Sequence, residues 1–170
     1  MSLHMHQVSV PVFARGLRVL STLLEKAQAH VEEHGIVPDI LIGARLADDM
    51  LPLSAQVQRV SDASKLAVER LTGVASPKFE DDETSFAQLQ QRIAATLAYL
   101  EGVDASHFEQ SASREVKLNY GTFQPVFRGD DYLLTFALPN FYFHLVTAYD
   151  ILRNQGIQIG KRDYLGPYQG

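Results

Sequence analysis

The sequence contains no cysteine, and this absence excludes disulfides, thiolate chemistry, zinc knuckles and iron–sulfur clusters. It also has no apolar run as long as a membrane span. The first ten residues, MSLHMHQVSV, lack the basic region and long apolar stretch of a signal peptide. We therefore expect a soluble cytoplasmic protein without a membrane partner.

Basic residues are also few, with 15 Lys and Arg against 20 Asp and Glu, which gives a net charge of -5. A protein that binds nucleic-acid phosphates needs a basic face, so nucleic acid is not expected as a partner. With 46% apolar and 21% charged residues, a chain of 170 residues is typical of a globular protein with a real core. We expect one domain spanning residues 1–170.

Apolar residues that recur at spacings of three and four predict three long helices, over about 11–35, 46–73 and 86–102. Pro52 requires the second helix to begin shortly before it or to bend there. The repeated spacing favours near-parallel packing in a bundle. The three stripes are Phe13, Leu17, Leu20, Leu24, Ala27 and Val31; Leu46, Met50, Leu53, Val57, Val60, Ser64, Ala67 and Leu71; and Phe86, Leu89, Ile93, Leu97 and Leu100.

The pattern changes after residue 114. REVKLNYG alternates apolar and polar residues and predicts a strand, with DYLLTF (131–136) as its partner after a turn at Gly129 and Asp130. A fourth helix is predicted to begin near Pro139. The expected fold is mainly α: an up-down four-helix bundle with a short β-hairpin between helices three and four.

The fourth helix is apolar on more than one side, because Tyr142, Phe143 and Val146 lie off its core stripe. Either the hairpin and the tail (156–170) cover this extra surface, or a second subunit does. We expect a symmetric homodimer. The aromatic tail is expected to pack back on the bundle.

Two charged motifs have structural explanations. The acidic run from Glu80 to Glu83 precedes the third helix, and we expect it to offset the N-terminal helix dipole rather than to bind calcium. His30 to His34 contain H-x-x-E-H, a zinc-protease spacing, but the motif lies in the last turn of a helix. That position favours interaction with the helix C-terminus.

His144 is the main candidate for a binding site. It lies about 60° to one side of the core stripe of its helix, and Gln56 lies about 60° to one side of the second stripe. Asp49 precedes Gln56 by seven residues on the same flank. If these flanks face each other, Asp49, Gln56 and His144 meet in a groove that could bind a small polar ligand or a metal. They could equally form a structural hydrogen-bond network.

The segments ARLADDMLPLSAQVQ, LPNFYFHLVTAYDILRNQG and IGKRDYLG, with this order of elements, resemble the DinB/YfiT-like superfamily of four-helix-bundle metalloenzymes. The closer resemblance is to a relative within a domain family of unknown function. It implies a commonly dimeric bundle. For metal-binding members of the superfamily, the resemblance implies three histidine ligands, one on the second helix and an H-x-x-x-H pair on the fourth. His144 matches the first of that pair, whereas Ala148 occupies the second position and Gln56 lies near the second-helix position. Glutamine is a poor ligand for the usual divalent metals.

Three hypotheses follow. The first is a dimeric bundle whose groove, with His144, Gln56 and Asp49, binds a small polar ligand and has lost the metal. The second is a divalent-metal-dependent enzyme of the DinB type, a hydrolase or thiol transferase, in which His144 acts with Asp49 or His6. The third is a structural or interaction protein with His144 in its core. The sequence identifies no catalytic residue and no cofactor other than the metal of the second hypothesis.

Overall fold

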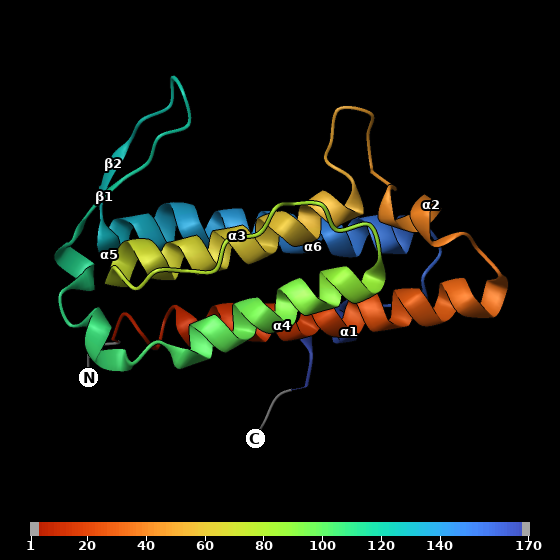
Figure 1. Ribbon diagram of the computed structural model, residues 1–170, viewed down its shortest axis with the longest axis horizontal. Helices are drawn as coiled ribbons and strands as arrows, with labels where there is room; N and C mark the ends of the chain where they lie inside the picture. The colour runs from red at the N-terminus through yellow and green to blue at the C-terminus, as the bar shows by residue number, and fades with distance from the viewer. Residues whose placement is uncertain (1–3, 168–170) are drawn as a thin grey trace.

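The computed structural model describes residues 4–167, and within them four long helices form a bundle (Figure 1). These are α1 (Val10–His34), α3 (Leu53–Thr72), α4 (Phe86–Gly102) and α6 (Leu138–Asn154). The shorter elements are α2 (Pro38–Ile42), η1 (Ala105–Phe108), η2 (Ser111–Ser113), β1 (Glu115–Lys117), β2 (Val126–Arg128), α5 (Gly129–Asp131), η3 (Tyr132–Ala137) and α7 (Lys161–Leu165). The predicted mainly-α bundle with a hairpin before its last long helix is confirmed.

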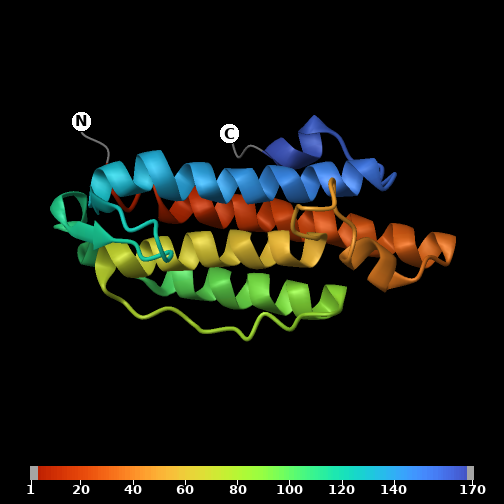
Figure 2. The ribbon, with the colours of Figure 1, turned by 90° about the horizontal axis from the view of Figure 1, so that it is seen from above.

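The long helices do not simply alternate in direction. α1 and α6 run one way, and α3 and α4 run the other, because segment 73–85 crosses the length of the bundle between α3 and α4 (Figures 1 and 2). The order is therefore up-down-down-up, and α3 packs directly against both α4 and α6. The predicted stripes of α1 and α4 are buried except for Leu97, which is half-buried.

The start of α3 differs from the prediction. Leu46 and Met50 were expected in this helix, but it begins at Leu53, with Pro52 in an extended conformation at its N-cap. The proline ring disfavours a helical conformation for the residue before it, so the helix cannot extend back through residue 51. Asp49 consequently lies in a loop, and its seven-residue spacing from Gln56 is not a helical one.

The partner of the first strand was also predicted wrongly. β1 pairs antiparallel with β2, with Val116 opposite Phe127, and not with residues 131–136. The latter are helical: Tyr132 and Leu133 are buried. An apolar run this short is compatible with either a strand or a helix, and here packing against α3 selects the helix.

A π-helical segment, η3, continues α5 directly into α6, so that residues 129–154 form one continuous helix. It ends two residues before Pro139. Proline has no N–H and its ring collides with the carbonyl four residues earlier, so an ordinary α-helical turn cannot pass through this position undisturbed. The wider π turn accommodates it.

The tail packs back on the bundle, as predicted, up to the last described residue. Ile157 and Ile159 are buried, and the Tyr164 ring meets the Tyr149 ring edge-to-face at 5.8 Å. Lys26 on α1 forms an ion pair with Asp163 at 2.6 Å. Among residues 4–167, no helix combines the length and apolarity needed to cross a membrane.

Candidate functional site

His144 on α6 and Gln56 on α3 form a direct hydrogen bond, with 2.7 Å between His144 Nδ1 and Gln56 Oε1. Gln56 is only 1% exposed, and its amide nitrogen donates to the Leu51 carbonyl at 3.0 Å. That bond leaves Gln56 Oε1 facing the imidazole, so Nδ1 must carry the proton and donate. Nε2 of His144, which has no hydrogen-bond partner among residues 4–167, is then available as an acceptor.

The imidazole is neutral at physiological pH. Burial, with a smaller contribution from the nearby Arg59 guanidinium, lowers the pKa of His144 to about 4. A neutral ring with Nδ1 already bonded can accept a hydrogen bond or bind a metal through Nε2.

The other residues proposed for this site are not joined to it. Asp49 is exposed in the loop before α3 and makes no hydrogen bond or ion pair with His144 or Gln56. His6 packs edge-to-face on Phe108, with ring centroids 5.3 Å apart.

The residues present do not fit the three-histidine metal site that the resemblance implies. Ala148 has no donor atom, and both polar ends of the Gln56 amide are already bonded. Within the described part of the chain, no three His, Asp or Glu side chains gather closely enough to hold a metal ion. His30 and His34 stack on each other at 4.1 Å at the end of α1, and His34 bonds the His30 carbonyl.

His144 opens onto a groove of about 420 Å³ between α3 and the continuous helix 129–154. This volume suits a small organic ligand. From α3 come Arg59, Asp62, Ala63, Leu66 and Arg70; from the facing helix, Tyr132, Phe136, Ala137, Asn140 and His144; and from the hairpin loop, Tyr120 and Phe123.

The π turn explains why one helix face supplies so many of these residues. Tyr132, Phe136, Asn140 and His144 are spaced by four, and in a regular α-helix each such step rotates the side chain by about 40°. The wider turn of η3 reduces that rotation between Tyr132 and Phe136. The four side chains therefore remain along one groove.

The hairpin loop supplies two aromatic rings, those of Tyr120 and Phe123, to one end of the groove. The hairpin itself rises above α3 and α5 (Figures 1 and 2). Tyr120 and Phe123 exchange backbone hydrogen bonds across a two-residue turn, at 2.9 and 3.3 Å. Gly121 supplies the positive φ of 68° that such a turn requires. Residues opposite each other in a hairpin project to the same face, so both rings lie on one side.

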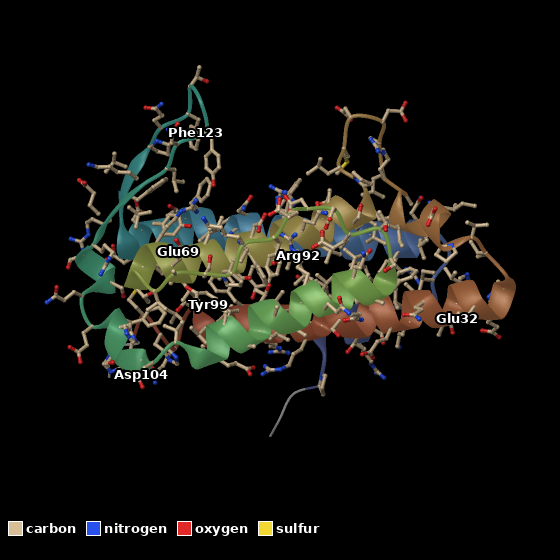
Figure 3. All side chains as sticks on the ribbon, in the orientation of Figure 1. Glu32, Glu69, Arg92, Tyr99, Asp104 and Phe123 are labelled. Atoms are coloured by element: carbon tan, nitrogen blue, oxygen red, sulfur yellow. The ribbon has the colours of Figure 1, made fainter. Side chains whose placement is uncertain are left out.

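A charged cluster borders the other end. Arg92, only 2% exposed, lies between α3 and α4 (Figure 3) and contacts Asp62, Asp81 and Glu83 at 2.8, 2.6 and 2.9 Å. Burial alone would raise the pKa of Asp81 and Glu83, but hydrogen bonds from Arg92 outweigh it and hold both pKa values below their usual range.

The acidic run has a contact that its sequence position did not indicate. Two of its carboxylates hold segment 73–85 to Arg92, while Ser85 caps α4 by accepting from the Gln88 amide. Asp62 belongs both to this cluster and to the groove.

A larger hollow, about 830 Å³, lies between α1 and α7 and is lined by Arg15, Arg18 and Arg162 among others. It extends to Pro167, the last described residue. The groove at His144 is the better candidate because it combines charged, amide, imidazole and aromatic side chains.

Comparison with known proteins agrees with this architecture. Residues 5–165 match the family described as "Domain of unknown function (DUF1993)". The crystal structure of a DinB family member protein from Shewanella denitrificans is similar, with 38% sequence identity and a TM-score of 0.89 over 98% of this chain and 95% of that one. No curated protein matches. The chain therefore belongs to the DUF1993 family, a domain family of unknown function, and shares its fold with a DinB family member.

Proposed function

We propose that this protein binds a small polar ligand in the groove between α3 and the helix 129–154, without the three-histidine metal of DinB-type enzymes. The observation that carries the proposal is the Gln56–His144 hydrogen bond at 2.7 Å, which fixes a neutral imidazole at the edge of a 420 Å³ groove. Asn140, Arg59 and Asp62 add amide, cationic and anionic groups around it. Convergent polar groups in one concave surface are typical of ligand sites.

Thermal melts against a library of small polar molecules test the proposal. We expect at least one compound to raise the melting temperature of the wild type but not of His144→Ala. Val12→Ala, at a partly exposed position of α1 outside the groove, is the control and should keep the response. If no compound shifts the wild type, and His144→Ala and Gln56→Ala are merely less stable, the groove is a structural network only.

The loss of the metal is tested separately. Protein purified without a metal-affinity tag and dialysed against Zn²⁺, Mn²⁺ or Ni²⁺ should contain far less than one equivalent of metal. Ala148, which has no donor atom, and the Gln56 amide, which is hydrogen-bonded at both its oxygen and its nitrogen, support this expectation. One equivalent of transition metal that disappears in His144→Ala would instead favour the DinB-type enzyme, in which His144 acts with ligands such as Asp49 or His6.

We also propose that the protein is a homodimer through the outer face of α6. Tyr142, Phe143 and Val146 remain exposed there, Phe143 to 58%. An apolar helix face of this kind is typical of a surface covered by another subunit. Sedimentation at micromolar concentration should give about twice 18.9 kDa, and Val146→Glu should return the monomer mass. A monomeric wild type would contradict the proposal.

A further inference from the structure

The groove has two chemically different ends. Arg59 and His144 border one end, and Arg70 and Tyr132 border the other. Arg59 and Arg70 are about 16 Å apart along the axis of α3, from the rise of the α-helix. The site therefore suits an elongated ligand rather than a compact one.

Arg70 differs from the other arginines that border this region. Arg59 is paired with Asp81 at 2.6 Å, and Arg92 has three carboxylate partners. Among residues 4–167, no carboxylate forms an ion pair with Arg70; instead, its Nη1 donates to the Tyr132 hydroxyl at 2.9 Å. Its positive charge is therefore available to an anion in the groove.

The Tyr132 hydroxyl strengthens this end as an anion receptor. Burial raises the pKa of Tyr132, although the Arg70 guanidinium acts in the opposite direction, so the phenol stays protonated at neutral pH. Its oxygen accepts the bond from Arg70, and in the described part of the chain its own proton has no acceptor. A guanidinium and a phenol O–H can donate together to one anionic oxygen group.

Next to Arg70, the groove is walled by flat rings that are incompletely covered. Tyr120 and Phe123 are 53% and 51% exposed, and Figure 3 shows Phe123 on the hairpin loop. The rings of Tyr120, Phe123 and Phe136 are near parallel, with interplanar angles of 16–25° and centroids 6.3–6.5 Å apart. Each exposes aromatic surface against which another flat ring can stack.

From these contacts we infer that the ligand is a flat aromatic molecule with an anionic group. Its anionic oxygens bind Arg70 and the Tyr132 hydroxyl, and its ring stacks on the three aromatic rings of Tyr120, Phe123 and Phe136. A polar substituent extends toward Asn140 and His144. This inference rests on the proposed function, since it names the class of ligand for the same groove. A saturated anion would lose the stacking, and a neutral aromatic would leave Arg70 without a counterion.

Three matched probes separate these contributions: 2-naphthoate, its neutral analogue 2-naphthamide, and the saturated anion cyclohexanecarboxylate. Calorimetric titration of the full chain should give the tightest binding for 2-naphthoate. Arg70→Gln keeps a donor for the Tyr132 hydroxyl but removes the charge. This variant should bind 2-naphthoate about tenfold or more weakly and should keep nearly the same affinity for 2-naphthamide. Unchanged binding of 2-naphthamide would also show that the groove of the variant is intact. Phe123→Ala should lower the affinity for both aromatic probes about threefold to tenfold.

Arg18→Gln, at an exposed position on α1, is the matched control and should bind 2-naphthoate like the wild type. The inference is overturned if cyclohexanecarboxylate or 2-naphthamide binds as tightly as 2-naphthoate, or if Arg70→Gln has no effect on 2-naphthoate. If none of the three probes binds, but the polar library gives a ligand that depends on His144, the proposed function stands and only the aromatic-anion class is wrong. If neither set binds, both fail.

Discussion

Replacing Arg92 by methionine should destabilise the protein strongly at neutral pH. The guanidinium is buried and contacts three carboxylates at 2.6–2.9 Å, and its carbon lies 4.5 Å from the centre of the Phe79 ring. Methionine keeps much of the apolar volume but leaves the carboxylates without their shared cation. Removing one partner of a buried ion pair typically costs about 3–5 kcal/mol.

We expect the lower end of that range, about 3 kcal/mol, because the cluster retains other cations and is partly open to solvent. Lys65 still pairs with Asp62 at 3.1 Å, and Arg59 with Asp81 at 2.6 Å. Urea unfolding followed by circular dichroism at pH 7 measures the loss. Arg18→Met removes an exposed ion pair with Glu101 and should cost under about 1 kcal/mol.

The pH dependence gives a second test of the same reasoning. In the wild type the pKa values of Asp81 and Glu83 are lowered, so their contribution to stability is present above the unfolded pKa values and is lost as the pH falls. Arg92→Met lacks that contribution, so the difference in stability between variant and wild type should begin to shrink only near the unfolded carboxyl pKa values, about pH 4 to 5, and should shrink further as the pH falls below them. A loss below about 1 kcal/mol at pH 7, or a loss that is independent of pH, would refute this account of the cluster.

The remaining predictions concern His144, two glycines and a helix cap. The pKa of His144 is about 4 in the folded state, whereas the imidazole of the unfolded chain takes up its proton near pH 6.5. The stability of the wild type relative to His144→Asn should therefore fall by roughly 3 kcal/mol between pH 6.5 and 4. A stability difference that does not change with pH would contradict the buried neutral ring. Gly129→Ala would place a Cβ 1.8 Å from the Ser111 carbonyl oxygen and should cost more than about 2 kcal/mol in urea unfolding, whereas Gly102→Ala, with open space around it, should cost nothing. Ser85→Ala removes the capping box of α4 and should lower stability by about 1 kcal/mol in the same assay; no change would mean that the cap contributes nothing.

The sequence was most informative where local rules decide the structure. α1 ends one residue before Gly35, and α3 one residue before Gly73, because each glycine adopts the left-handed conformation that closes a helix. His144 and Gln56 could be paired in advance because each lies on the flank of a well-defined apolar stripe. In the structure the two side chains are joined by a hydrogen bond between His144 Nδ1 and Gln56 Oε1.

Features that depend on chain reversals could not be predicted in this way. Arg92 lies on a helix with a clear stripe, but its partners Asp81 and Glu83 belong to a segment without periodicity. Asp49 was placed by extending a helical period through Pro52, where the backbone does not allow it.

The groove residues from 132 to 144 had a detectable pattern that was missed. Every fourth position carries one of them: Tyr132, Phe136, Asn140 and His144. Because a strand was expected over 131–136, the first two were not assigned to the same helix as the others. The aromatic loop residues Tyr120 and Phe123 reach the groove only because β1 pairs with β2. No local sequence pattern predicts which segment a short strand will pair with.

The π turn also makes the two ends of the groove independently adjustable. Deleting one residue from η3 would narrow the wide turn and rotate everything before the deletion by about 100° relative to α6. Tyr132 would then swing away from Arg70, while His144 would keep its bond to Gln56. One insertion or deletion in this helix would therefore change the surface at the arginine end and leave the imidazole end intact, without rebuilding the bundle.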